Sequence, residues 1–284
     1  MCDDGLLHDD PINATIAPDL KLSEAGLTLN TIKCEIYAEY ALQLPKALEG
    51  IPVILDKSQW SYLGCPLTPS HNSAVNIAIA KSRLLLDKIA EIGKKHPHAI
   101  GLLRACMGAC RFEHLCQSVQ CSDDFLEKLS TISSDLKTTM SNILATELSE
   151  VQWRQATLPL RHGGLGIRDH SLLYPASRWS SLESSRINAI RLGALKPFVN
   201  IQVSAARHQF YVVSGLTSVN FNKEQKMQVQ LVDILTQANK IRLMSSLTGF
   251  HVQRLSSLQT PHAISWATGF STWFSIHQKP HVLR

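Results

Sequence analysis

The hydrophobic positions along the 284-residue chain change their spacing near residue 70. Before that point, short apolar runs in "KCEIYAEY" and "SQWSYLGCPL" are bounded by turn residues, which predicts short strands of a small sheet. After it, apolar residues recur every three or four positions, the spacing of amphipathic helices. This spacing predicts helices over 70–93, 98–120, 123–148, 174–192 and 223–246, whereas "FVNIQVSAARHQFYVVSGL" fits a helix or a strand.

The clearest of these helices is 123–148. Ser122 can cap it, and Asp123 and Asp124 suit the positive N-terminal end of a helix. Its apolar stripe is continuous and consists of Phe125, Leu129, Ile132, Leu136, Met140, Ile143 and Leu144. Three successive helices after a short β/α segment predict a mainly α fold with a helical bundle.

The composition, 44% hydrophobic and 18% charged, is that of a packed globular chain. No run of about 18 apolar residues occurs, so we expect no membrane association. The seven cysteines are odd in number and lie in apolar segments, which indicates reduced thiols. We therefore expect an intracellular protein, in the cytoplasm or nucleus, and expect Cys106, Cys110, Cys116 and Cys121 to pack in the core.

The net charge of +5 is distributed unevenly. Residues 1–150 hold 13 Lys and Arg against 19 Asp and Glu, whereas residues 151–284 hold 15 against 4. A basic half is typical of a surface that contacts nucleic-acid phosphates, although a solvated cationic face without a partner would give the same count. The cations that begin this half are Arg154, Arg161, Arg168, Arg178, Arg186, Arg191 and Lys196.

The basic half opens with "LPLRHGGLGIRDH", residues 158–170, which contains Gly163, Gly164 and Gly166. Glycines gathered in this way indicate a sharp turn or a close approach of backbone. Their spacing fits neither common phosphate-binding glycine motif. Two interpretations remain open, a turn that lets Arg161 and Arg168 reach phosphate and a turn required only for helix packing.

A pair of carboxylates, Asp3 and Asp4, comes directly before Gly5. Adjacent carboxylates in a turn can hold Mg²⁺ for phosphoryl transfer, and Asp-Asp-Gly is also an ordinary turn sequence.

Taken in order, several segments resemble the C-terminal half of the reverse transcriptase of non-LTR (LINE-like) retrotransposons. The segments are "CDDGLL", "EAGLTLNTIKCEI", "WSYLGCPL", "LLRACMGACRFEHL", "QWRQATLPLRHGGLGIRD" and "RLSSLQTPHAISWATGF". They cover nearly the whole chain, and "GLTLNTIKCE" and "LPLRHGGLGIRD" are the most specific.

The resemblance implies a role for several residues. Asp3 and Asp4 match the aspartates of the polymerase Y-x-D-D box, which hold Mg²⁺, and Met1 stands at the position of the tyrosine. Lys33 matches the lysine of the G-L-x-L-N-x-x-K motif, whose implied role is to stabilise the leaving pyrophosphate. Leu63 and Gly64 match the turn that positions the primer end.

The same resemblance implies a domain order. Residues 1–68 are expected to be the end of a palm, residues 69–157 a thumb-like bundle, and residues 158–284 a basic helical region. The expected partner is RNA or an RNA–DNA hybrid, gripped by its backbone. The expected nucleic-acid-binding residues are Arg154, Arg161, Arg168 and Arg178.

By the same resemblance, we expect the fingers, most of the palm and a third metal-binding aspartate to be missing from this chain, and we expect it to be inactive as a polymerase on its own. Two other functions remain open, a repurposed nucleic-acid-binding helical module and a helical protein-interaction scaffold. The sequence leaves the oligomeric state undetermined.

Overall fold

The computed structural model describes residues 34–38, 41, 50–62, 65–66, 73–222 and 224–259. The chain divides into two compact units, 1–77 and 78–284. Within the described ranges the protein is mainly helical, as the spacing of apolar residues predicts.

The described part of the first unit contains two short pairs of strands. One pair is parallel, with Ile36 opposite Val53, and the other is an antiparallel hairpin, with Tyr62 opposite Cys65. The expectation of strands in "KCEIYAEY" and "SQWSYLGCPL" is confirmed. The elements are β1 (Ile36–Tyr37), β2 (Val53–Ile54), η3 (Lys57–Gln59), β3 (Ser61–Tyr62) and β4 (Cys65–Pro66).

The predicted helix over 98–120 is wrong as a single element. The chain instead forms two helices that separate at Met107 and Gly108, where Gly108 takes an extended conformation with ψ −158°. A Cβ on Gly108 would lie 2.8 Å from the carbonyl oxygen of Arg104. Only glycine therefore fits at this break between the two helices. The elements from here are α2 (Ser73–Gly93), η4 (Pro97–Ala99), α3 (Ile100–Cys106), α4 (Ala109–Ser118) and α5 (Asp123–Leu144).

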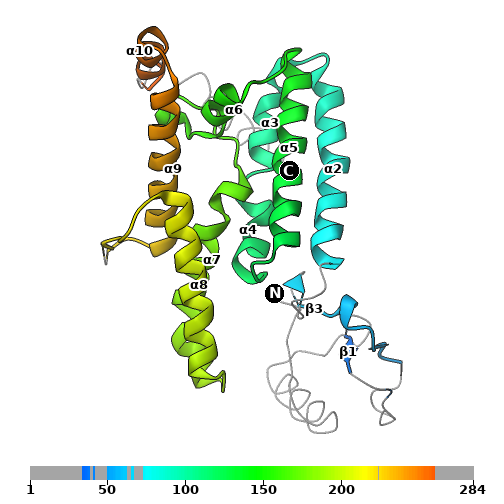
Figure 1. The fold of residues 1–284 in the computed structure, drawn as a ribbon. Coiled ribbons are helices and arrows are strands. Elements are labelled where there is room, and N and C mark those ends of the chain that lie inside the picture. The colour runs from blue at the N-terminus through cyan, green and yellow to red at the C-terminus, as the bar shows by residue number, and fades with distance from the viewer. Residues whose placement is uncertain are drawn as a thin grey trace, which may run out of the picture. The chain divides into compact units, whose positions relative to one another are not determined.

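Helix α5 confirms the predicted cap and most of the predicted stripe, but it ends at Leu144 and not at residue 148, and Leu144 is exposed. The Ser122 Oγ accepts a hydrogen bond of 3.2 Å from the Phe125 amide, and the stripe is buried from Phe125 to Ile143. Helix α2 runs beside it (Figure 1), joined by a 2.8 Å ion pair between Arg83 and Asp135. The expectation of buried cysteines holds for Cys116 and is wrong for Cys106 and Cys121, which are exposed.

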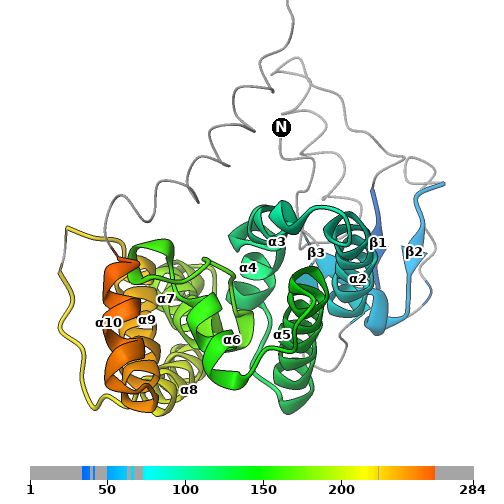
Figure 2. The ribbon, with the colours of Figure 1, turned by 90° about the horizontal axis from the view of Figure 1, so that it is seen from above.

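Helix α7 is the central element of the second unit. It packs against α4 and α5 with one part of its surface and against α8 and α9 with another (Figures 1 and 2). The ambiguous segment after residue 197 is helical, because one face of α8 is buried against α7 and α9. The remaining elements are α6 (Glu150–Thr157), η5 (Leu160–His162), α7 (His170–Arg191), α8 (Lys196–Ser214), α9 (Met227–Ser246) and α10 (Gly249–Ser257).

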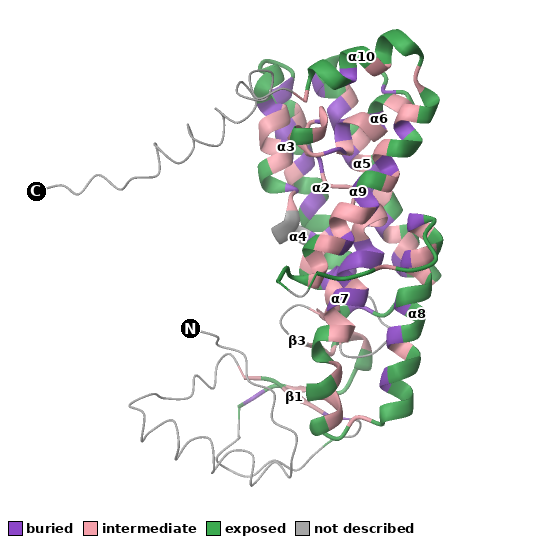
Figure 3. Cartoon of the chain, turned by 90° about the vertical axis from the view of Figure 1, so that its left-hand side faces the viewer, coloured by how far each residue is buried: buried purple, intermediate pink, exposed green. Residues whose placement is uncertain are grey.

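Two groups of buried side chains hold the C-terminal helices together, and Figure 3 shows them along the inner faces of the helices. The larger joins α7, α8 and α9 around Trp179 and Phe210, and the smaller joins Leu158, Leu243 and Leu255. The predicted boundary after residue 157 falls at the end of α6, inside the second unit, and that after residue 68 lies among residues that the structure does not describe.

Candidate nucleic-acid interface

The glycine-rich segment is a turn that folds back on the end of α6 and leads into α7. The amides of Leu165 and Ile167 both donate to the carbonyl oxygen of Ala156, each at 3.2 Å, and the Gly166 amide donates to Leu158 at 2.9 Å. These bonds satisfy carbonyl groups at the C-terminal end of α6 that have no partner within the helix. The turn is therefore fixed by backbone contacts.

Steric constraints explain why each of these three positions of the turn is a glycine. Gly163 and Gly166 have φ angles of 77° and 70°, a region that side chains disfavour. A Cβ on Gly164 would collide with the carbonyl oxygens of Leu158 and Gln155. The glycines thus serve backbone packing, the second interpretation that the sequence left open, and they also fix the position of η5.

Helix η5 presents two side chains beside α9. Arg161, 60% exposed, forms an ion pair with Asp233, and the His162 ring lies 3.3 Å from the Gln237 amide nitrogen. Lys240 donates to the Gln259 side chain at 3.2 Å. We call this surface the turn patch, and it comprises Arg161, His162, Asp233, Gln237 and Lys240.

The turn patch contains more cations than carboxylates. The pKa of His162 is lowered first by partial burial and then by the charges of Lys240 and Arg161, with Asp233 acting in the opposite direction. Two cations therefore outweigh one carboxylate around this imidazole. Such a surface favours an anionic ligand.

Arg154 lies on α6 and forms an exposed ion pair of 3.5 Å with Glu150, one helical turn earlier. Exposed pairs of this kind contribute at most about 1 kcal/mol. Arg154 therefore remains able to exchange its partner for a phosphate.

Arg168 has a different environment from Arg154 and Arg161. Its Nη1 lies 3.7 Å from Glu113 Oε2, and both side chains are largely covered. Glu113 also accepts hydrogen bonds from Ser177 Oγ, at 2.6 Å, and from the Gln228 amide. The carboxylate thus joins α4, α7 and α9, and Arg168 belongs to this internal network.

Arg178 is also held inside the fold. Its Nη1 donates to the carbonyl oxygens of Gln117 and Ser118, at 2.7 and 2.9 Å. These carbonyls end α4, where a cation is favourable. Burial lowers the pKa of the Arg178 guanidinium, and its nearest polar partners are these backbone groups. We therefore assign Arg178 to helix capping.

His170, the first residue of α7, is 1% exposed and gives the fold a dependence on pH. Burial lowers its pKa, Arg168 acts in the same direction, and the Met107 carbonyl at 3.3 Å, Glu113 and Asp169 oppose the shift. The unfolded state thus binds a proton more readily below about pH 6.5, and folding stability falls as the pH decreases through that value.

We expect His170→Gln to reduce the loss of unfolding free energy between about pH 7 and pH 5, by no more than about 1.4 kcal/mol per pH unit. Urea titrations at several pH values measure the unfolding free energy of the variant and of the wild type. The control His251→Gln removes an exposed imidazole and should retain the pH dependence of the wild type. If the unfolding free energy of His170→Gln depends on pH as that of the wild type does, His170 is not the source of this pH dependence.

The residues predicted for catalysis, Asp3, Asp4 and Lys33, and for primer positioning, Leu63 and Gly64, lie outside the described residues. Among the residues that the structure does describe, no group of three His, Cys, Asp or Glu side chains is placed to hold a metal ion. In the same ranges, no helix has both the length and the apolarity needed to cross a bilayer.

Sequence reasoning identified Arg161 and missed Lys240 and Glu113. Lys240 lies about 80 residues away in α9, and only the packing of α9 on α6 and the turn brings it near His162. Glu113 lies in "LLRACMGACRFEHL", one of the segments that carry the resemblance, but the resemblance implies no role for this residue. The excess of cations after residue 150 was the available signal for Lys240, and the resembling segment around Glu113 was the available signal for that residue.

Comparison of the chain with protein-family models, with curated proteins and with solved structures gives no significant match.

Proposed function

We propose that this chain is the end of the palm, the thumb and the following helical region of a non-LTR reverse transcriptase, and that its turn patch binds the phosphate backbone of an RNA–DNA or RNA duplex. The observation that carries the binding proposal is that Arg161 and Lys240 both act on the His162 imidazole, while Asp233, the partner of Arg161, is the carboxylate that opposes them. The motif resemblance supplies the identity of the ligand.

Ligand binding at the turn patch requires little rearrangement. The Arg161–Asp233 pair is exposed on both sides, so breaking it costs at most about 1 kcal/mol. A phosphate offers the guanidinium a bidentate acceptor, as a carboxylate does, so it can replace Asp233 as the partner of Arg161. Glycine-fixed backbone holds η5 in place, so binding does not have to order the turn.

The four arginines expected to bind nucleic acid have two different roles in this proposal. Arg161 contacts phosphate directly, and Arg154 does so on α6. Arg168 and Arg178 support the surface from within, through Glu113 and the end of α4.

The roles of Asp3, Asp4 and Lys33 in polymerase chemistry, and of Leu63 and Gly64 in primer positioning, stay predictions from the resemblance. Duplex binding by the turn patch does not depend on them.

Removing both cations of the turn patch tests the proposal. We expect Arg161→Gln/Lys240→Gln to weaken binding to a short RNA–DNA hybrid by tens of fold in about 0.1 M salt, because about two phosphate contacts are lost. The slope of log K against log salt should decrease in magnitude by about 2. Fluorescence anisotropy over a series of salt concentrations measures both quantities.

The control is Lys196→Gln/Arg207→Gln, which removes the same charge from α8. Lys196 and Arg207 are exposed, and neither forms an ion pair with a carboxylate of the described residues. This variant should retain the affinity of the wild type to within a few fold. Equal losses for the two variants would indicate a general charge effect, and a salt-independent wild-type affinity would refute backbone binding.

A further inference from the structure

Helix α8 has two apolar faces. Val199, Val203, Ala206 and Phe210 are buried, with spacings of four, three and four residues. Val203, Ala206 and Phe210 belong to the larger core cluster with Trp179 of α7 and Leu231 of α9. This face alone accounts for the position of α8 in the fold.

The second face is a stripe on the side of α8 away from this core. Phe198, Ile201 and Val212 are 59%, 64% and 65% exposed, in contrast to 5% for Val203. Figure 3 shows exposed residues along much of this helix. With spacings of three, four, three and four residues, the full stripe repeats as a coiled-coil seam does, and it consists of Phe198, Ile201, Ala205, His208 and Val212.

The stripe carries no fixed charge on either flank. Gln202, Ser204 and Gln209 border it, and all three are uncharged polar residues. At about 100° per residue, Lys196 and Arg207 lie roughly 140–160° around the helix from the centre of the stripe. The stripe therefore offers no cation to a phosphate, to an anionic lipid surface or to an acidic peptide.

We propose that this face of α8 binds a second copy of the chain, with the two α8 helices antiparallel. Because the flanks are uncharged, two identical stripes meet without like-charge repulsion. The two largest apolar side chains of the stripe, Phe198 and Ile201, lie in its first half, and the smallest, Ala205, lies at its centre. An antiparallel arrangement therefore places Ile201 against Ala205 of the second copy and Phe198 against its His208, so that a single patch is complementary to itself.

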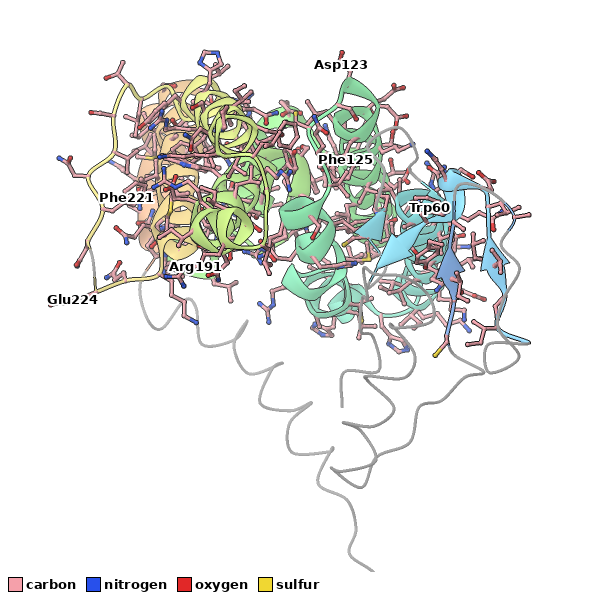
Figure 4. The ribbon with its side chains drawn as sticks, turned by 90° about the horizontal axis from the view of Figure 1, so that it is seen from below. Trp60, Asp123, Phe125, Arg191, Phe221 and Glu224 are labelled. Atoms are coloured by element: carbon pink, nitrogen blue, oxygen red, sulfur yellow. The ribbon has the colours of Figure 1, made fainter. Side chains whose placement is uncertain are left out.

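The size of the stripe sets the strength of the association. A helix of 19 residues is about 28 Å long, and one stripe of it buries less than the roughly 800 Å² per partner of a standard interface. Leu192 and Leu195, 88% and 75% exposed, lie in the connection between α7 and α8, before the first residue of the stripe. Figure 4 shows Arg191 at this end of α7. We expect a monomer–dimer equilibrium with a dissociation constant in the micromolar range.

Sedimentation equilibrium of the whole chain from about 1 to about 200 µM tests the association, since this range brackets a micromolar constant. The wild type should change from monomer to dimer, and Ile201→Glu should raise the dissociation constant at least about tenfold, because it buries an unpaired carboxylate at the interface. Ile187→Glu, at a 61% exposed position on α7, is the matched control and should dimerise as the wild type does. A wild type that stays monomeric throughout, or a dimer that Ile201→Glu leaves intact, would overturn the proposal.

A mixing experiment tests the antiparallel arrangement. Ile201→Glu and Ala205→Lys should each weaken self-association, and an equimolar mixture should recover dimers, because Glu at 201 then faces Lys at 205 of the other copy. In a parallel pair Glu at 201 would face isoleucine and Lys at 205 would face alanine, so recovery no greater than in a mixture of either variant with the wild type would refute the arrangement. Hybrid binding by the turn patch should be unaffected by Ile201→Glu, so failure of this proposal is distinguishable from failure of the proposed function.

Discussion

Replacement of Gly164 by alanine should destabilise the protein by about 3 kcal/mol, because the new methyl group meets rigid backbone. A Cβ at this position collides with the carbonyl oxygens of Leu158 and Gln155. Neither atom can move alone, since Leu158 is buried and its carbonyl accepts from the Gly166 amide at 2.9 Å. The turn has to separate from the end of α6, which also displaces Arg161 and His162. Urea unfolding followed by circular dichroism measures the loss.

Gly101→Ala is the matched control for this substitution. Gly101 lies in the first turn of α3, and a Cβ there meets nothing within 4 Å. Alanine is the better helix former by up to about 1 kcal/mol, so this variant should be as stable as the wild type or more so. If Gly164→Ala is as stable as Gly101→Ala, the turn does not fold back on α6 as described.

Phe210→Ala should cost about 3–5 kcal/mol, the usual range for removing a buried aromatic ring. Phe210 is fully buried, and its ring centroid lies 5.2 Å from that of Trp179 on α7. Its cluster also includes Leu231 and Leu235 of α9, so the cavity opens where three helices meet. The midpoint of chemical unfolding should decrease substantially, and tryptophan fluorescence, which reports on Trp179 among others, should detect the change.

Phe221→Ala tests whether burial, rather than ring contact, sets that cost. The Phe221 ring also contacts Trp179, at 5.6 Å between centroids, but Phe221 is 38% exposed in the connection between α8 and α9 that Figure 4 shows. We expect a loss of about 1 kcal/mol, because solvent replaces much of the lost contact. Equal losses for Phe210→Ala and Phe221→Ala would contradict the cluster as the main support of α8.

The sequence predicted those elements whose information is local. Helix α5 has a serine cap, acidic residues in its first turn and a stripe that matches the helical period, and all three features are present in the structure. The break at Gly108 was missed, because the apolar spacing continues across it while the backbone does not. Ile187 and Ile241 also fit an apolar helical pattern and are nevertheless exposed, since no other described element covers them.

The candidate site was predictable only in part. The charge count located an excess of cations after residue 150, and the glycine turn located Arg161. The pairing of each cation depends on residues far away in the chain, such as Asp233 for Arg161 and Glu113 for Arg168. Arginines that are alike in sequence therefore divide into surface and internal groups only after folding.

The sequence by itself determined that this protein is mainly helical, where most of its helices lie and that its C-terminal half is basic, because helical period, capping and charge are carried by neighbouring residues. The tertiary structure alone decided that 196–214 is a helix, that Gly164 is required by a backbone contact, and which arginines remain exposed. These features depend on which surfaces meet when α7, α8 and α9 pack, and contacts between distant residues are not encoded in the local pattern of either partner.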